Sequence, residues 1–78
     1  MKIEVLGPGC PKCKKTEKVL REAARETRAD VELTHVTDIA TISERGVFMT
    51  PGVVIDEEIV SEGKVPTVEQ AREWLRRA

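Results

Sequence analysis

The sequence has few cysteines, no excess of either charge and no long apolar run, and each absence excludes a class of protein. Two cysteines in 78 residues are too few for a secreted scaffold held by several disulfides. The 13 Lys and Arg against 14 Asp and Glu give a net charge of −1, which argues against a dedicated nucleic-acid binder. No apolar run approaches the roughly 18–20 residues of a membrane helix, so we expect neither nucleic acid nor membrane as a partner.

Signals for export, repetition and internal linkers are missing as well. Residues 1–6, MKIEVL, are too short and too charged for a signal peptide, so we expect a cytoplasmic protein. The chain contains no repeat, low-complexity tract or Ser/Gly-rich linker. Its 40% hydrophobic and 35% charged residues are typical of a soluble globular chain. We therefore predict one domain over residues 1–78.

Hydrophobic periodicity in the first half of the chain predicts a strand, a helix and a second strand. Apolar residues at positions 3, 5 and 6 predict the first strand, which Gly7-Pro8-Gly9 ends. From Pro11 to about Arg28 the pattern is that of an amphipathic helix. Residues 31–36 alternate as a β-branched strand. The predicted buried stripe of the helix is Thr16, Val19, Leu20, Ala23, Ala24 and Thr27.

The second half predicts a short helix, a hairpin and a last helix. The short helix spans residues 38–45, with a capping-box pattern at Thr41-Ile42-Ser43-Glu44 and a terminator at Gly46. Residues 53–55 and 59–60 form an antiparallel hairpin across a short break. Thr67 and Gln70 make a second capping box that opens the last helix. Its predicted core residues are Val68, Ala71, Leu75 and Ala78, with Trp74 at their edge.

The resulting order, β-α-β-α-β-β-α, defines the predicted fold. The first strand-helix-strand unit is expected to be a right-handed crossover between parallel strands. The hairpin then supplies the antiparallel edge of the sheet. We therefore predict an α/β fold in which helices cover both faces of a four-stranded mixed sheet.

The cysteine pair Cys10-Pro11-Lys12-Cys13 lies where the first strand leads into the first helix. Residues three apart on a helix have Cβ atoms about 5–6 Å apart, and a disulfide needs roughly 3.5–4.5 Å. A modest adjustment therefore makes both dithiol and disulfide accessible. Unpaired amide groups at the helix start favour a thiolate, most strongly at the exposed Cys10. Cys13, one turn further in, is expected to be shielded.

This asymmetry assigns a role to each cysteine. Cys10 attacks a disulfide of the substrate and forms a mixed disulfide, and Cys13 then attacks Cys10 to release the reduced product. Pro11 and Lys12 support the pair, Pro11 as a first-turn proline and Lys12 through its positive charge. Beyond the redox-active Cys10–Cys13 disulfide, we expect no cofactor and no bound metal.

Three other interpretations of the pair stay open at this point. The first is a carrier of soft metal, copper or zinc, because metal-carrier domains also place two cysteines between a first strand and a first helix. The second is a structural zinc site, which needs about four ligands, whereas the chain offers Cys10, Cys13 and the distant His35. The third is an inert disulfide, although closing so short a loop stabilises a fold only weakly. His35 itself is interpreted as a strand residue without chemistry.

A proline at Thr50-Pro51 precedes the apolar run of the hairpin, where a strand-start proline is expected. With the cysteine motif and the element order, this dipeptide makes the chain similar to the thioredoxin superfamily, from Ile3 to the last helix. The likeness is to the small thioredoxin/glutaredoxin-like proteins called redox-active disulfide proteins. Further matching features are Gly46-Val47, Gly52, Val54-Ile55-Asp56 and Gly63.

The resemblance implies a minimal thioredoxin fold and dithiol–disulfide exchange with protein disulfides. It also implies a cis peptide bond at Pro51, with the backbone of Thr50 offering hydrogen bonds to an incoming peptide. A thioredoxin-type reductase would supply the electrons, and we expect a monomer. The sequence departs from the superfamily in places: no tyrosine lies between the cysteines, and Gly63-Lys64-Val65 lacks the glutathione-seating glycines of glutaredoxins. The proton acceptor for Cys13 is unassigned, since Glu4 is the only acid in the first strand.

Overall fold

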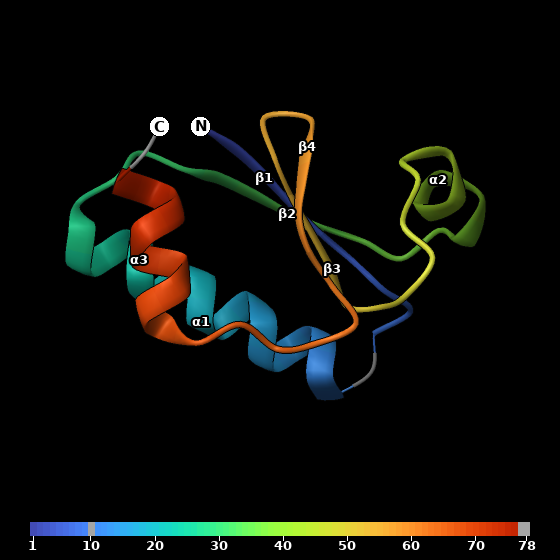
Figure 1. The fold of residues 1–78 in the computed structure, drawn as a ribbon, viewed down its shortest axis with the longest axis horizontal. Helices are drawn as coiled ribbons and strands as arrows, with labels where there is room; N and C mark the ends of the chain where they lie inside the picture. The colour runs from blue at the N-terminus through green and yellow to red at the C-terminus, as the bar shows by residue number, and fades with distance from the viewer. Residues whose placement is uncertain (10, 77–78) are drawn as a thin grey trace.

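The computed structural model describes residues 1–9 and 11–76 (Figure 1). Along these residues the elements follow the predicted order, strand-helix-strand-helix-strand-strand-helix. The strands are β1 (Lys2–Leu6), β2 (Glu32–Val36), β3 (Gly52–Ile55) and β4 (Glu58–Glu62). The helices are α1 (Pro11–Thr27), α2 (Ile39–Glu44) and α3 (Val68–Arg76).

The four strands form one mixed sheet in the order β2-β1-β3-β4. β1 pairs in parallel with β2 and antiparallel with β3, and β3 pairs antiparallel with β4, so the predicted sheet is confirmed. In this register Leu6, the last residue of β1, lies opposite both Val36 and Gly52. The ends of β1 and β2 and the start of β3 therefore meet at one edge of the sheet, where α1 also begins.

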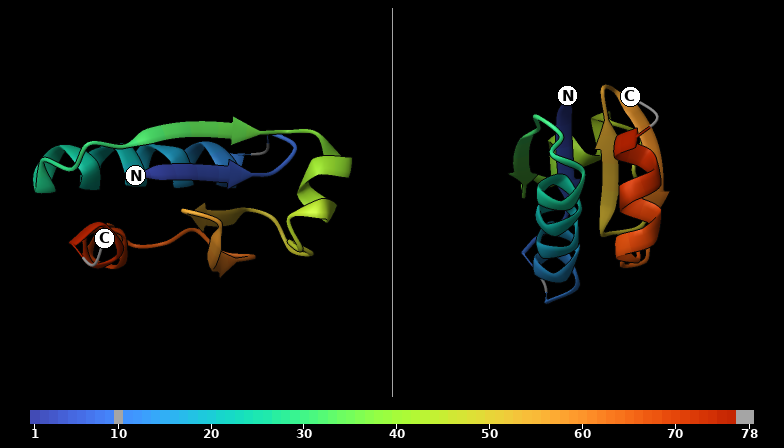
Figure 2. Two further views of the ribbon diagram at one scale, coloured as in Figure 1. Left: turned by 90° about the horizontal axis from the view of Figure 1, so that it is seen from above. Right: turned by 90° about the vertical axis from the view of Figure 1, so that its left-hand side faces the viewer.

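Helices cover both faces of the sheet, as predicted. α1 and α3 pack side by side on one face, and the right-hand view of Figure 2 looks onto this pair. α2 lies on the opposite face, over one end of the sheet. The core under α1 and α3 consists of Ile3, Val5, Leu20, Ala23, Ala24, Val53, Ile55, Ala71 and Leu75. The smaller core under α2 consists of Leu6, Ile42, Val47 and Val54.

The capping box of α3 is confirmed. The short helix α2 lies where it was predicted, within residues 38–45, but its predicted capping box at Thr41 is wrong. Thr67 Oγ1 accepts a hydrogen bond from the Gln70 amide, and Gln70 Oε1 accepts one from the Thr67 amide. In α2 the N-cap is Asp38, whose carboxylate accepts from the backbone and the hydroxyl of Thr41. Thr41 is the third residue of this helix, so its amide is one of the first-turn donors that a cap side chain satisfies.

The β3–β4 hairpin turns on two residues, Asp56 and Glu57, which both adopt positive φ. This is the backbone of a type I′ turn, which suits the twist of paired strands. The Asp56 carboxylate also accepts a hydrogen bond from the Lys2 amide at 2.8 Å, so the turn is fastened to the start of β1. Ala78, predicted to face the core, lies outside the described residues. None of the described helices is long and apolar enough to cross a membrane.

The cap of α2 is expected to make stability depend on pH. Hydrogen bonds from the Thr41 hydroxyl and amide hold the pKa of Asp38 below its ordinary value of 3.8. The ionised Asp38 carboxylate therefore adds to the free energy of unfolding. This contribution is fully present above the pKa of an unfolded aspartate and is lost as pH falls through the lowered folded-state pKa. Urea midpoints compared between the parent and Asp38→Asn, which caps without ionising, should differ most at about pH 6 and draw together as pH falls below the pKa of an unfolded aspartate, about 3.9. A difference that stays constant over this range would contradict the assignment.

Candidate active site

Cys13 lies in the first turn of α1 and is completely buried, as predicted for the shielded cysteine of the pair. Pro11 and Lys12, which precede it on the same turn, are exposed. The Thr16 hydroxyl donates to the Lys12 carbonyl at 2.8 Å and so ties the start of the helix to its second turn. Cys10 lies outside the described residues, so its exposure and its pairing with Cys13 remain predictions.

The Cys13 sulfur packs directly against Gly7, the residue that follows β1. A Cβ added at position 7 would overlap the Cys13 Sγ, so a residue without a side chain is required at this point. The same added atom would lie 3.5 Å from the Thr50 Cβ. Gly7 is therefore where the end of β1, the first turn of α1 and the approach to β3 converge.

Thr50 and Pro51 stand at this convergence, where the resemblance placed them. The Thr50–Pro51 peptide bond is cis. Pro51 is buried and Thr50 is exposed, so Thr50 lies at the surface beside Gly7. The structure thus brings three of the predicted site residues, Cys13, Thr50 and Pro51, to the same edge of the sheet.

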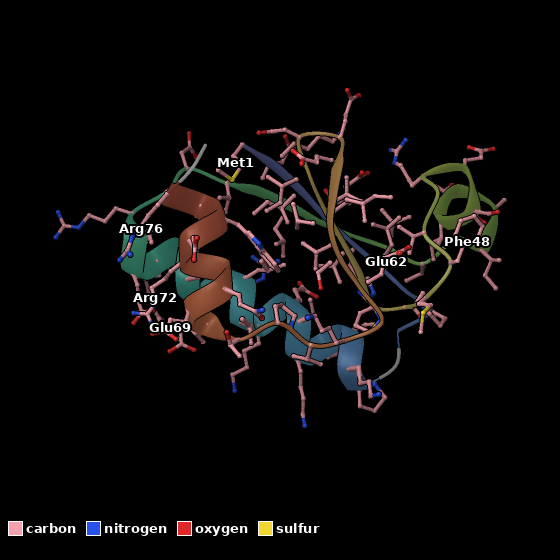
Figure 3. All side chains as sticks on the ribbon, in the orientation of Figure 1. Met1, Phe48, Glu62, Glu69, Arg72 and Arg76 are labelled. Atoms are coloured by element: carbon pink, nitrogen blue, oxygen red, sulfur yellow. The ribbon has the colours of Figure 1, made fainter. Side chains whose placement is uncertain are left out.

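The loop before Pro51 is held in place from the end of β4. The Gly63 amide hydrogen bonds with the carbonyls of both Met49 and Pro51, at 3.1 and 3.0 Å. The Glu62 carboxylate accepts from the Phe48 amide at 3.0 Å. Phe48 and Glu62 lie on the α2 side of the molecule, away from α3, and the Phe48 side chain is 86% exposed (Figure 3). The loop therefore carries an exposed aromatic side chain on a fixed backbone.

A second anchor of this loop is the ion pair between Glu4 and Arg45. The two side chains meet in a fork, with Nε to Oε1 and Nη2 to Oε2 distances both at 3.0 Å. The Glu4 carboxylate raises the pKa of Arg45. Because Arg45 ends α2 and Glu4 lies in the middle of β1, the pair fixes where the chain leaves α2 for the loop. Sequence analysis noted Glu4 and missed its partner, although an acid in an apolar strand signals one.

The electrostatic surroundings of the cysteine motif are positive. The first turn of α1 contains no acidic residue, and its start carries the partial positive charge of unpaired amide groups. Lys12, Lys14 and Lys15 are exposed around it. Both features would stabilise a negative charge at this helix start.

Comparison with known proteins agrees with this geometry. The family model described as a thioredoxin domain matches residues 1–76. A thioredoxin of Methanocaldococcus jannaschii is 46% identical over 74 residues, which cover 95% of this chain and 85% of the relative. A thioredoxin of Methanothermobacter thermautotrophicus is 35% identical over 75 residues, which cover 96% of this chain and 97% of the relative. The chain belongs to the thioredoxin family.

Membership of the thioredoxin family confirms the predicted resemblance and the minimal thioredoxin fold. It identifies the chain as a thioredoxin-like redox protein. Within residues 1–9 and 11–76, no three His, Cys, Asp or Glu side chains are grouped so as to hold a metal ion.

The contact between Gly7 and Cys13 predicts a cost for any side chain at position 7. We expect Gly7→Ala to destabilise the fold by about 1–3 kcal/mol, because the new methyl group displaces the buried sulfur or the strand end. The exposed neighbour Pro8 is the matched control, and Pro8→Ala is expected to change stability by less than about 0.5 kcal/mol. Urea unfolding measures both variants. Equal stability of Gly7→Ala and the parent would show that the contact is not tight.

Removing Arg45 is expected to destabilise the protein more than removing an exposed arginine. In Arg45→Met the Glu4 carboxylate, with 10% of its side chain exposed, loses its partner. The control is Arg21→Met, since Arg21 is 61% exposed in its pair with Glu17. The urea midpoint should fall at least about twice as far for Arg45→Met. Adding Glu4→Leu should recover most of that loss, and a further fall instead would argue against an uncompensated carboxylate as the cause.

Proposed function

We propose that this protein reduces protein disulfides through a dithiol formed by Cys10 and Cys13. The observation that carries the proposal is the placement of Cys13: buried in the first turn of α1, against Gly7 and beside the exposed Thr50. A shielded cysteine three residues after a helix-start cysteine suits the second, resolving step of disulfide exchange. The membership of the thioredoxin family supports the same chemistry.

The proposed reaction has two exchange steps. The Cys10 thiolate attacks one sulfur of the target disulfide, which forms a Cys10–target bond and releases the other target sulfur as a thiolate. Cys13 gives up its proton and attacks the Cys10 sulfur. The Cys10–Cys13 disulfide forms, and the second target thiolate leaves. Two electrons have then passed to the target, and each released thiolate takes a proton from solvent.

Thr50 and Pro51 are proposed to bind the target segment. The Pro51 ring is buried, and the neighbouring Thr50 is exposed at the edge of the sheet. An extended segment lying there would place its disulfide near the start of α1, because Thr50 and Cys13 both contact the space around Gly7. Backbone hydrogen bonds to Thr50 would hold the segment without selecting its sequence.

A thioredoxin-type reductase is proposed as the source of electrons, and no bound cofactor beyond the Cys10–Cys13 disulfide is needed for the exchange. The metal-carrier alternative gains no support from the fold. Carriers of that type follow the order β-α-β-β-α-β, whereas α2 separates β2 from β3 in this chain and α3 follows β4.

The two cysteines are expected to fail in different ways when replaced. Cys10→Ser should abolish reduction of insulin disulfides, because no sulfur is left to attack the target. Cys13→Ser should accumulate mixed disulfides with targets, since the resolving sulfur is missing. Turnover is measured as insulin precipitation, and trapped complexes are measured by mass spectrometry with and without a reductant. Full activity of Cys10→Ser would overturn the assignment.

The source of electrons is tested separately. The oxidised protein is incubated with NADPH and a thioredoxin reductase, and in parallel with glutathione. Reduction in the first mixture and little in the second is expected, because the segment 63–65 lacks the paired glycines that seat glutathione in glutaredoxins. Faster reduction by glutathione would place the protein with glutaredoxins in its electron supply.

A further inference from the structure

The His35 side chain is held between the end of β1 and helix α1, with 22% of it exposed. Its Nε2 lies 3.1 Å from the Gly7 carbonyl oxygen. A carbonyl only accepts hydrogen bonds, so Nε2 carries the hydrogen and donates it. The other ring nitrogen, Nδ1, lies 3.9 Å from a Glu17 carboxylate oxygen, which is beyond hydrogen-bond distance. Both the neutral Nε2–H ring and the protonated ring can therefore make the Gly7 bond.

Two neighbouring residues of β2 thus fix both backbone groups of Gly7. The Gly7 amide donates to the Val36 carbonyl at 2.9 Å, and the Gly7 carbonyl accepts from the His35 side chain. The first bond continues the parallel pairing of β1 and β2 one residue beyond the strands. The second comes from a side chain 28 residues away in sequence, so it is a specific tertiary contact.

Pro8 and Gly9, the two residues after Gly7, have features that constrain the backbone little by themselves. Pro8 has no amide hydrogen to donate. Gly9 adopts φ of +91°, and an added Cβ there would meet nothing within 4 Å. Gly7 packs against the Cys13 sulfur, so the bond from His35 holds a residue that is in direct contact with that sulfur.

We propose that His35 is a positioning residue that keeps Gly7 closed over the Cys13 sulfur. The inference rests on the proposed function in one respect: a closed Gly7 reserves Cys13 for the second exchange step and shields it from small electrophiles and foreign disulfides. The hydrogen bond supplies this enclosure in either protonation state of the ring. Glu17 faces the opposite nitrogen and pairs with Arg21 at 2.9 Å, so it has no direct part in the enclosure.

The test measures how fast Cys13 reacts with iodoacetamide in a Cys10→Ser background. This background leaves Cys13 as the only thiol in the chain. His35→Leu removes the donor at similar size and is expected to raise the alkylation rate roughly three- to tenfold, the range set by one neutral hydrogen bond. His35→Gln keeps an amide donor at a similar reach and should stay within about twofold of the parent. This rescue separates the hydrogen bond from simple packing.

Glu17→Gln is the matched control, because it removes the charge beside Nδ1 and leaves the Gly7 bond intact. Its alkylation rate should stay within about twofold of the parent. Urea unfolding of every variant shows that the rates refer to folded protein, and His35→Ala replaces His35→Leu if the leucine variant does not fold. As a second measurement, exchange of the Gly7 amide hydrogen should accelerate in the donor-free variant and not in His35→Gln.

The outcomes are decisive in both directions. The proposal would be overturned if the alkylation rate were unchanged in folded His35→Leu, or if it were equal in His35→Leu and His35→Gln. A comparable rise of that rate in Glu17→Gln would also overturn it. The alkylation assay uses protein that lacks Cys10 and cannot reduce a disulfide. If the proposed function is wrong, the parent protein will not reduce insulin disulfides. The order of Cys13 alkylation rates among the variants would not be affected by that result.

Discussion

The contact between the Gly7 backbone and the Cys13 sulfur is the constraint on which the arrangement of the site depends. A sulfur buried in the first turn of a helix needs a neighbour that approaches without a side chain, and the strand end supplies one. The approach requires β1 to stop at Leu6 and α1 to begin four residues after Gly7. Thr50 lies at the same point, since its Cβ would be 3.5 Å from a Cβ at position 7. One close contact, between the Gly7 main chain and the Cys13 sulfur, therefore depends on the register of the sheet, on the start of α1 and on the position of the loop before Pro51.

The surrounding structure holds that contact from several directions. Val36 and His35 fix Gly7 from β2, and Gly63 fixes the segment around Pro51 from the end of β4. The Glu4–Arg45 pair fixes the exit from α2. Each tether comes from a different element, so the geometry at Cys13 draws on the whole sheet. A small protein with a modest core can keep a reactive group in place in this way, because directed polar contacts supplement limited apolar burial.

Helices, strands and their pairing into a sheet could be predicted from patterns in short stretches of sequence, and side-chain contacts between distant stretches could not. The Thr67–Gln70 box and the helix from Pro11 follow from local spacing, and the cis bond before Pro51 followed from the family resemblance. The Glu4–Arg45 and His35–Gly7 contacts join residues 41 and 28 positions apart, and spacing carries no signal for them. The short helix was predicted over residues 38–45 with its capping box at Thr41, because both Asp38 and Thr41 suit a cap. The hydrogen bonds from Thr41 to the Asp38 carboxylate show which residue caps the helix, and they form only in the folded chain.

At the tip of the β3–β4 hairpin, a charged residue occupies a backbone conformation that favours glycine. Glu57 adopts φ of 72°, a conformation in which glycine would be unstrained. The Glu57 charge nevertheless adds to that of Glu4, which is the main cause of the raised pKa of Arg45. Relaxing the tip with a glycine would therefore remove a distant counterion from the joint at which α2 gives way to the cis-proline loop. The charge carried by the hairpin turn therefore acts on Arg45, where the chain leaves α2 for the loop before Pro51.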